Sequence, residues 1–443
     1  MSRWRPYPRY KDSGVEWLGK TPAHWSIQKL KHISSVEYSG VDKHKRDEEQ
    51  PVRLCNYVDV YYNDYITDDL ELMRATASTD EIRNFTLRGS DVIITKDSES
   101  WDDIAVPAYV PSDLEGVLCG YHLALIRPDE QIVSGKYLFR SFSARGINDQ
   151  FRVAANGITR YGLGKYWLEN SVFPVPSLPE QRAIAAFLDR ETARIDALVE
   201  KQERLIALLQ EKRAAFISHT VTKGLDPNVP MKDSGIPSIG LIPAHWETQR
   251  NKHVFEERDE RSVAGEEELL SVSHITGVTP RSEKEVYMFM AESMEGYKLC
   301  HPGDLVINTM WAWMGALGVT EYEGIVSPSY HVYRLRKEHA SEYVPKYLDL
   351  LYRTPVYVCE ITRHSKGVWT SRLRLYPDSF FDIQTVTPPR TEQIQIVTHV
   401  SRQIQRMDEL VDKSRQFIGL LQEYRTALIS AAATGKIDVR EEV

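Results

Sequence analysis

The chain has 443 residues, of which 42% are hydrophobic and 27% are charged, and its formal net charge at pH 7 is −8. This length predicts two to four domains, and the composition is that of a folded protein. The negative net charge argues against a nucleic-acid-binding surface that covers the whole protein, although it leaves room for a local basic groove.

The cysteine pattern and the absence of long apolar runs predict a soluble, cytoplasmic chain. The four cysteines are far apart and form no CxxC motif: Cys55, Cys119, Cys300 and Cys359. We therefore expect buried, reduced thiols and neither a disulfide framework nor a metal site. The N-terminus lacks the apolar core of a signal peptide, and no run of about 18 apolar residues occurs.

Two regions of mixed strand and loop composition alternate with two helical stretches. Each region begins with a Pro-Ala-His-Trp motif, at 22–25 and again at 243–246. Strands are predicted at 52–62, 91–95 and 120–126 in the first region, and at 269–275, 304–308 and 330–335 in the second. Short helices are predicted around 136–147 and around 343–353. The duplication indicates two copies of one domain, each followed by a long helix.

The first long helix is predicted over 178–222. Its seam residues recur at intervals of seven: Leu188, Ile195, Gln202, Leu209 and Phe216. Ile184, Leu198 and Leu205 fill much of a second row, as in the a/d pattern of a helix with one apolar face. So narrow a seam over roughly 60 Å of helix requires a second helix to cover it.

The second helix begins near Arg390 and is a copy of the first. A shift of 212 residues aligns Glu180-Gln181 with Glu392-Gln393 without a gap. The seam continues as Val400, Met407, Ser414, Leu421 and Leu428, with Ile396, Leu410, Phe417 and Tyr424 beside it. Gln202 and Ser414 are polar residues at corresponding seam positions, where we expect them to determine the register of the helix pair.

Gly14 to Thr21 satisfies the P-loop pattern GxxxxGK[ST]. The preceding segment is polar, Pro22 follows where a helix would begin, and the second copy has Leu241-Ile242 in place of Lys-Thr. We therefore expect no nucleotide binding here.

The histidines of the two Pro-Ala-His-Trp motifs, His24 and His245, are candidate metal or catalytic residues. No second ligand lies at a suitable spacing, so we favour a packed turn in which the tryptophan anchors the N-terminal segment.

The sequence also lacks the signatures of a hydrolase or a methyltransferase. Thr387-Pro388-Pro389-Arg390 is not the catalytic loop of an amino-methyltransferase. Pro377-Asp378 with Asp382-Ile383-Gln384 matches a nuclease PD…(D/E)xK site only in part, because Gln replaces the lysine. We expect no catalysis in this chain.

Basic and aromatic residues cluster in loops of both regions. Lysine and arginine neutralise phosphates, and arginine also recognises a guanine edge. The alternative interpretation is solvated surface charge and core aromatics. The strongest segments recur in both copies, at 157–161 and 367–372. The candidate DNA-binding residues are Lys43, Lys45, Arg46, Tyr61, Lys96, Trp101, Arg160, Tyr161 and Lys165, and in the second copy Arg281, Lys284, Trp311, Trp313, Arg363, Lys366, Trp369, Arg372 and Arg374.

This organisation resembles the DNA specificity subunit of type I restriction–modification systems. The resemblance covers nearly the whole chain and rests on the two Pro-Ala-His-Trp motifs, the two glycine segments and the repeated helices. The helical segments are the most specific, with Glu180-Gln181, Ile195-Asp196 and Arg213 returning in the second copy. The second glycine segment is tryptophan-rich and shifted by two residues. Individual base contacts therefore do not transfer residue by residue from the family to this segment.

The resemblance implies an α+β fold of two mixed α/β target recognition domains, separated by two long antiparallel helices that form a coiled coil with an internal pseudo-twofold repeat. The implied boundaries are 1–177 and 225–388 for the recognition domains, and 178–224 and 389–443 for the spacer helices. The resemblance implies a non-catalytic subunit that reads a split sequence in double-stranded DNA. Two methylation subunits with S-adenosylmethionine, and restriction subunits with ATP and Mg, are the implied partners. A two-module adaptor that bridges proteins without DNA is the alternative.

Overall fold

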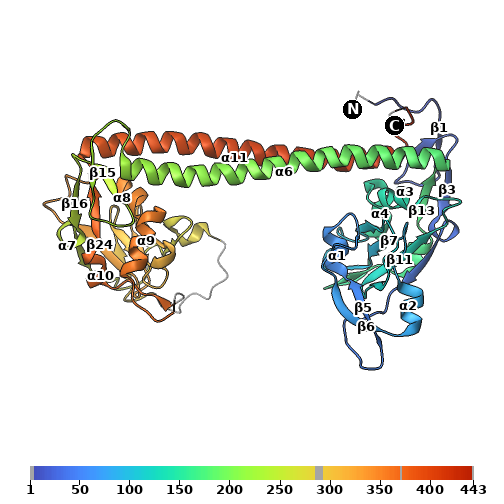
Figure 1. Cartoon of the computed structure of the whole chain (residues 1–443), viewed down its shortest axis with the longest axis horizontal. Coiled ribbons are helices and arrows are strands. Elements are labelled where there is room, and N and C mark those ends of the chain that lie inside the picture. The colour runs from blue at the N-terminus through green and yellow to red at the C-terminus, as the bar shows by residue number, and fades with distance from the viewer. Residues whose placement is uncertain (1–3, 285–292, 370–371, 442–443) are drawn as a thin grey trace. The chain divides into compact units, whose positions relative to one another are not determined.

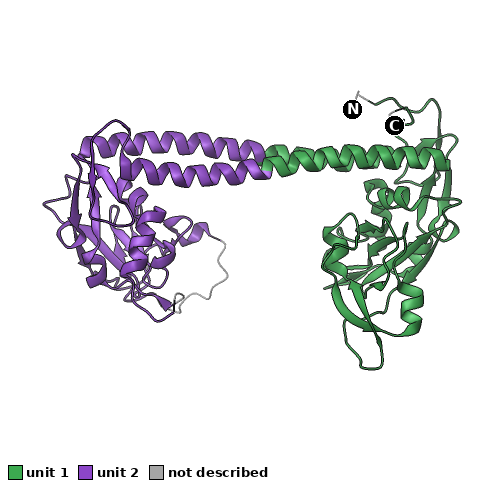
Figure 2. Cartoon of the chain, in the orientation of Figure 1, with its two compact units in different colours: residues 1–202, 415–443 green, residues 203–414 purple. Residues whose placement is uncertain are grey.

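The computed structural model describes residues 4–284, 293–369 and 372–441. The chain divides into two compact units (Figure 2). Unit 1 combines the chain up to Gln202 with the part from Arg415 onward, and unit 2 is Glu203–Ser414. Each unit therefore contains one α/β domain and a portion of both long helices.

The α/β domain of unit 1 is built on a four-stranded antiparallel sheet with the strand order β4-β11-β7-β9. Figure 1 labels its two central strands, β11 and β7. All four residues of β7 are buried, as its Val-Ile-Ile-Thr sequence favours. The elements are β1 (Tyr10–Asp12), β2 (Lys20–Pro22), β3 (Ser26–Lys29), η1 (Leu30–His32), β4 (Ser34–Tyr38), β5 (Gln50–Cys55), α1 (Tyr57–Tyr62), β6 (Met73–Ala77), α2 (Thr79–Phe85), β7 (Val92–Thr95), β8 (Asp97–Ser98), β9 (Pro107–Tyr109), β10 (Val117–Cys119), β11 (Leu123–Pro128), α3 (Gly135–Phe142), α4 (Arg145–Ala154), β12 (Tyr161–Gly162), α5 (Lys165–Glu169) and β13 (Val172–Val175).

Unit 2 repeats this sheet with the order β17-β24-β21-β22. Its elements are β14 (Met231–Asp233), β15 (Leu241–Pro243), β16 (Glu247–Arg250), α7 (Asn251–Val254), β17 (Phe255–Arg258), β18 (Leu270–Ser273), β19 (Gly277–Pro280), η2 (Arg281–Glu283), β20 (Lys298–Cys300), β21 (Leu305–Ile307), η3 (Ala312–Met314), β22 (Leu317–Val319), β23 (Gly324–Val326), β24 (His331–Leu335), α8 (Pro345–Tyr352), α9 (Pro355–His364), α10 (Pro377–Asp382) and β25 (Gln384–Thr387).

The strand prediction for 52–62 is wrong in its second half, where α1 follows β5. Asn56 begins this helix, because its backbone N–H donates to the Asp59 carboxylate at 2.7 Å and completes a capping box. A local cap therefore overrides the strand propensity of the Tyr-Val-Asp-Val-Tyr-Tyr run. The other predicted strands and short helices occur close to the expected places.

The two long helices are α6 (Leu178–Lys223) and α11 (Arg390–Ala433). In unit 1 the Arg425 side chain binds Asp196, with Nε 2.9 Å from Oδ1. In unit 2 Arg213 Nη1 lies 2.7 Å from Asp408 Oδ1. These are the same ion pair, since the shift of 212 residues relates Asp196 to Asp408 and Arg213 to Arg425.

The ten seam residues named above lie at buried or half-buried positions of α6 and α11. The second predicted row is wrong over much of its length, because Leu198, Leu205, Leu410, Phe417 and Tyr424 are exposed. The half-buried or buried second row instead lies four residues after the first and contains Val199, Ile206, Ile404, Val411 and Ile418. Two packed helices cover only one stripe of each other, so the apolar residues of the other row stay uncovered.

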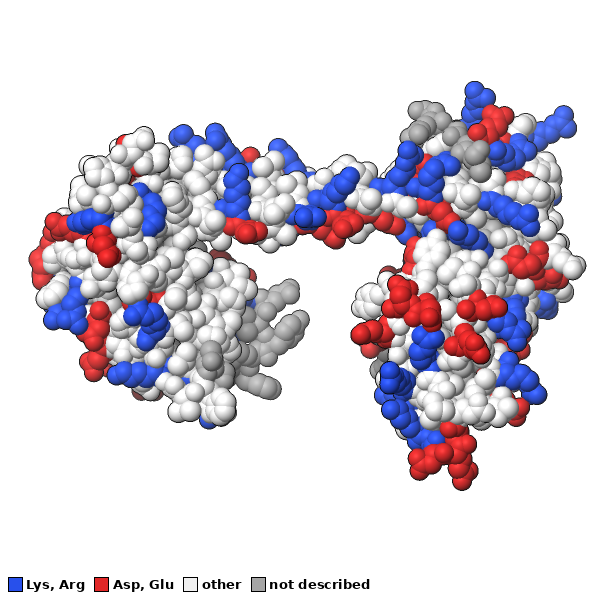
Figure 3. Space-filling model, in the orientation of Figure 1, with Lys and Arg blue, Asp and Glu red and all other residues white. Residues whose placement is uncertain are grey.

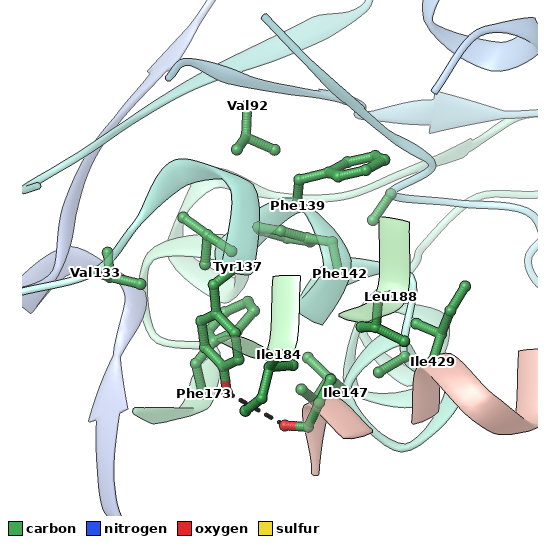
Figure 4. Close-up of a cluster of buried hydrophobic side chains, with 14 of the residues drawn as sticks. Val92, Val133, Tyr137, Phe139, Phe142, Ile147, Phe173, Ile184, Leu188 and Ile429 are labelled. Carbon is green, nitrogen blue, oxygen red and sulfur yellow. Dashed lines mark hydrogen bonds between the residues drawn. The ribbon is translucent and has the colours of Figure 1, made fainter. Parts of the chain in front are cut away.

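The core of unit 1 continues from the α/β domain into the helices. Figure 4 shows Ile184 and Leu188 of α6 and Ile429 of α11 in one cluster with Tyr137 and Phe142 of α3. Unit 2 repeats this arrangement with buried residues of α6, α8 and α11, among them Val221, Tyr347 and Ile396. Each domain is therefore packed on the helices and not merely tethered to them.

Three of the four cysteines are buried, but Cys359 is exposed, contrary to the prediction. Burial raises the pKa of Cys55 and Cys119, and that of Cys300 to about 12. These thiols are therefore neutral and shielded. Within residues 4–284, 293–369 and 372–441, no helix is both long and apolar enough to span a lipid bilayer.

We expect one of the four thiols to react quickly with a disulfide reagent in the native protein, and all four to react after unfolding. Titration with 5,5′-dithiobis(2-nitrobenzoate) measures the number, and Cys359→Ser should remove the fast phase. A fast phase that persists in Cys359→Ser would show that one of the buried cysteines is accessible.

Candidate nucleic-acid interface

The Pro-Ala-His-Trp motif anchors the start of each domain to the start of a long helix. In unit 1 the Trp25 Nε1–H donates to Glu180 Oε1 at 3.0 Å, and His24 Nε2 lies 3.0 Å from Glu180 Oε2. The same contacts in unit 2 are Trp246 to Glu392 at 3.0 Å and His245 to Glu392 at 2.8 Å. The packing interpretation of this motif is confirmed. In the part of the chain that the structure describes, no group of three or more metal-ligating side chains is present.

The glutamine after each of these glutamates forms a second anchor. Gln181 is fully buried; its Oε1 accepts from the Ser134 N–H at 2.8 Å, and its Nε2 donates to the carbonyls of Ile132 and Pro176 at 3.0 and 2.9 Å. The amide of Gln393 repeats all three bonds, with Val344 N–H, Glu342 O and Pro388 O. One glutamine in each helix thus determines where the connection before α3 or α8 lies.

The P-loop-like segment is a β-hairpin, not a phosphate loop. Lys20 and Thr21 lie in β2, which pairs with β1, and the next element is the strand β3 and not a helix. The Lys436 ammonium donates to the carbonyls of Leu18 and Lys20 at 3.2 and 2.6 Å. In unit 2 Lys223 donates to the carbonyls of Ile239 and Leu241. The turn holds a lysine at the end of α6 or just beyond the end of α11, and this function explains its repetition without the Lys-Thr pair.

The partial nuclease match falls on a short helix and the strand after it. Asp378 and Asp382 lie in the short helix α10, and Asp382 is paired with Arg250. No third carboxylate or histidine joins them among the residues described.

Two of the predicted residues of unit 1, Lys96 and Tyr161, lie at one end of its sheet. The Lys96 ammonium lies over the rings of Tyr38 and Tyr121, at 5.0 and 4.9 Å from their centroids. The Lys96 carbonyl accepts from Leu163 N–H at 2.8 Å, and Tyr161 pairs with Ser98. The sheet end and the glycine segment at 157–161 are therefore held together.

A histidine and an aspartate complete this end of the sheet. His122 Nδ1 lies 2.7 Å from Asp97 Oδ2, and His122 has a left-handed backbone with φ of 72°. Such a conformation in a residue other than glycine is uncommon and occurs often at functional sites. The dipeptide Tyr121-His122 returns as Tyr330-His331, a signal that the candidate list does not contain.

An aromatic group lies in α1 of the same unit. Tyr57 and Tyr61 stack with their ring centroids 5.5 Å apart, and Tyr62 and Trp101 are exposed. The hydrogen bond to Asp103 raises the pKa of Tyr61 to about 12, so this phenol is a neutral donor. Stacked, partly exposed rings of this kind are available to bases and sugars.

Unit 2 repeats the tyrosine and the histidine at the corresponding end of its sheet but surrounds them with different side chains. Asn308 Nδ2 donates to the Tyr330 hydroxyl at 2.9 Å, and His331 Nδ1 lies 2.7 Å from Glu257 Oε1. The rings of Trp311 and Trp313 are stacked with centroids 6.2 Å apart, and the Trp313 Nε1–H donates to Met310 O at 3.1 Å.

The remaining candidates fall into two groups. Some are exposed and have no acidic partner among the residues that the structure describes; others are engaged with the protein. The engaged residues are Arg46 with Asp42 and Glu49, Lys165 with Glu37, Arg363 with Glu360, Lys284 with Ser271, and Arg374 with a backbone carbonyl. The exposed residues are Lys43, Lys45, Trp101, Arg160, Lys366, Trp369 and Arg372. Arg281 is engaged as well: it lies close enough to Tyr330 to lower the pKa of that phenol, although burial raises that pKa more.

The charges of both units are interspersed on the face shown in Figure 3. Neither unit presents one continuous basic field in this view. Phosphate contacts by this chain would therefore be local to the exposed lysines and arginines, in agreement with the net charge of −8.

Comparison with solved structures identifies the fold. A chain from a structure of the type I R-M system, solved to explain complex assembly and conformational transition, superposes with a TM-score of 0.65 at 15% sequence identity and covers 94% of this chain and 99% of its own length. The HsdS subunit from Thermoanaerobacter tengcongensis superposes with a TM-score of 0.54 at 16% identity, covering 94% of this chain and 98% of its own.

The chain has the fold of HsdS. No family model matches it, and no curated protein matches it in sequence. The structural likeness extends over both α/β domains and both long helices, since so little of either chain is left uncovered.

Proposed function

We propose that the chain is the DNA-binding specificity subunit of a type I restriction–modification complex, and that it reads a bipartite target. The observation that carries this proposal is the duplication of the anchors in a chain with the HsdS fold. The glutamates, glutamines and lysines that attach each domain to the helices recur bond for bond, whereas the side chains at the sheet ends differ. Two readers with a common attachment and different surfaces are suited to two unlike half-sites.

In this proposal α6 and α11 form an antiparallel coiled-coil spacer with a pseudo-twofold repeat. The repeated ion pairs Asp196–Arg425 and Arg213–Asp408 support this arrangement, since each unit contains one of them. The target recognition domains are then 1–177 and 225–388, and the spacer segments are 178–224 and 389–443.

The exposed apolar row on the two helices supports the proposed partners. Leu198, Leu205 and Leu208 recur after 212 residues as Leu410, Phe417 and Leu420, and all six are exposed. Repeated uncovered apolar residues favour two equivalent protein contacts, one for each of two methylation subunits. The methylation subunits would supply S-adenosylmethionine chemistry, and restriction subunits would supply ATP- and Mg-dependent cleavage; this chain would do neither. The complex would act in the cytoplasm.

The test is to co-express the chain with the methyltransferase encoded beside it and to map modified adenines by single-molecule sequencing. The expected result is one bipartite motif with a gap of constant length. The absence of any such motif would refute the proposal. A salt titration of DNA binding by the assembled complex is an independent test. Phosphate contacts make the logarithm of the binding constant fall steeply with the logarithm of the salt concentration, whereas a protein-only adaptor shows no such dependence.

We expect the length of the helices to determine the gap between half-sites. Inserting seven residues into each helix, after Gln202 in α6 and after Ser414 in α11, keeps the heptad seam and adds about 10 Å, the rise of about three base pairs. The methylated motif should then have a longer gap with unchanged half-sites. An insertion of four residues in α6 alone, about one helical turn, should also alter the gap. An unchanged gap in the double insertion would refute the spacer function.

A further inference from the structure

Gly157 and Gly367 each follow the base of a β-hairpin, and the two bases have the same construction. At the base of the first, Asn156 and Gly162 exchange backbone hydrogen bonds at 3.1 and 2.9 Å. At the base of the second, Lys366 and Arg374 do so at 2.9 Å in each direction. In each unit the hairpin lies beside the strand end that carries the aromatic and histidine residues, through Leu163 N–H to Lys96 O and Leu375 N–H to Thr309 O.

The glycine that begins each tip is required by close packing. A Cβ on Gly157, whose φ is 155°, would lie 1.9 Å from the Arg160 carbonyl oxygen, and a Cβ on Gly367 would lie 2.7 Å from the Arg372 carbonyl oxygen. A side chain at either position would open the hairpin. The backbone of each tip is therefore tightly defined at the point where the next residue leaves it.

That next residue is a β-branched aliphatic residue in both units, and it is almost completely exposed. Ile158 is 94% exposed and Val368 is 93% exposed. A single exposed aliphatic side chain needs no explanation. Two of them at the same position of a duplicated hairpin, each with few rotamers to lose on binding, indicate a contact with something outside the chain.

The side chains that follow are not shared between the two hairpins. Thr159 and Arg160 follow in the first hairpin, whereas Trp369 follows in the second; Trp369 and Arg372 are both exposed. An exposed basic residue is near the aliphatic residue in each, namely Arg160 and Lys366. The shared element is thus a glycine, an aliphatic tip and a positive charge, while the rest of each loop has diverged.

We propose that Ile158 and Val368 are apolar wedges, one for each half-site, that insert between base pairs of the bound duplex. This inference rests on the proposed function. Aliphatic residues that enter a base step unstack it partly, and the neighbouring Arg160 and Lys366 contact the adjacent phosphates. A wedge acts on any sequence, which explains why the aliphatic residue is common to both readers. The diverged residues beside it, Tyr161 in one unit and Trp369 in the other, then distinguish the half-sites.

The test uses the complete complex with its methylation partner, without S-adenosylmethionine, on a duplex that carries the motif methylated by the wild-type complex. Permanganate detects unstacked thymines, and diethylpyrocarbonate detects unstacked purines, so every base step is examined. Each variant is used at a concentration that saturates the duplex. We expect hyperreactive bases in both half-sites for the wild type, their loss in one half-site for Ile158→Ala, and their loss in the other half-site for Val368→Ala.

Matched variants separate a wedge from a general effect of exposed aliphatic residues. Val153 and Val263 are 83% and 87% exposed outside the hairpins, and Val153→Ala and Val263→Ala should retain both sets of hyperreactive bases. Ile158→Val should retain them as well, since valine occupies this place in unit 2.

Hyperreactivity that is unchanged in Ile158→Ala and Val368→Ala, or that is absent from the wild-type complex on its motif, would overturn the wedge. A changed motif with unchanged hyperreactivity would also overturn it in favour of direct base contact. If the wild-type complex methylates no bipartite motif, the proposed function itself fails, and this outcome is distinct from the others.

Discussion

Replacing Gln181 by alanine should lower the free energy of unfolding of unit 1 by about 3 kcal/mol, because the substitution leaves a backbone N–H and two carbonyls without their partner in a buried site. The side chain is fully buried, and its three hydrogen bonds are between 2.8 and 3.0 Å. For a unit of this size the loss corresponds to a fall in melting temperature of roughly 6–12 °C. Differential scanning calorimetry should show it as a shift of one transition.

The repeat supplies the controls for this experiment. Gln393 makes the same three bonds in unit 2, so Gln393→Ala should shift the other transition by a similar amount. Gln210 is an exposed glutamine on α6, and Gln210→Ala should change neither transition. Equal shifts of both transitions in Gln181→Ala would contradict the assignment of this anchor to unit 1 alone.

Replacing Asp189 by alanine should lower the free energy of unfolding of unit 1 by about 3 kcal/mol, because it leaves a buried guanidinium without its principal acceptor. Arg140 is 2% exposed, and its Nη2 and Nε lie 2.9 and 3.2 Å from Asp189 Oδ1. The Tyr65 hydroxyl also donates to Asp189 Oδ1, and burial raises the pKa of Tyr65 to about 12, which keeps this donor protonated. Asp64 stays 3.4 Å from Arg140 Nη1 and limits the loss. Denaturant unfolding monitored by circular dichroism measures the change.

Unit 2 again provides a control, since the shift of 212 residues places the exposed Ser401 at the position of Asp189. Ser401→Ala should leave the stability unchanged. Asp189→Asn keeps an acceptor oxygen and should lose less than Asp189→Ala. A loss in Asp189→Ala that disappears at 1 M salt would indicate a screened surface pair in place of a buried one.

The sequence predicts the repeated parts of this protein well, because a motif in one copy can be compared with the same position in the other copy. The P-loop pattern at 14–21 was dismissed because the second copy lacks Lys-Thr, and the structure shows a hairpin that receives Lys436. The Trp25 anchor is favoured over a metal site because no second ligand lies at a suitable spacing. Its acceptor, Glu180, was not foreseen, since 155 residues separate the two.

Predictions that depended on side-chain direction were less successful. The rule of one apolar residue in seven located the Leu188 row but placed the second row on the wrong side of it, so that Leu198 and Leu410 are exposed. The run at 52–62 has strand propensity, but the Asn56 cap converts its second half to α1. The exposure of Cys359 depends on which face of α9 packs against the rest of the domain. The sequence around Cys359 does not indicate this face.

The sequence predicts which loops contain the candidate DNA-binding residues, but it does not predict which of these residues lie next to one another. Lys96, Tyr121 and Tyr161 come from distant segments, and the sheet end and the hairpin at 156–162 bring them together. Arg46 and Arg363 appear basic in the sequence, yet acidic neighbours engage their guanidinium groups. The repeated Tyr-His dipeptide was the available signal for His122 and His331.

The sequence by itself determined the duplication, the two long helices and the motifs that recur at their starts, because hydrophobic periodicity and repeated residues are properties of the linear chain. Only the tertiary structure decided which helix face is covered, which acceptor holds each tryptophan, and which charges are already engaged within the protein. These outcomes depend on contacts between residues far apart in the chain. Their free energy comes from burial and from hydrogen bonds that form only when the two segments meet.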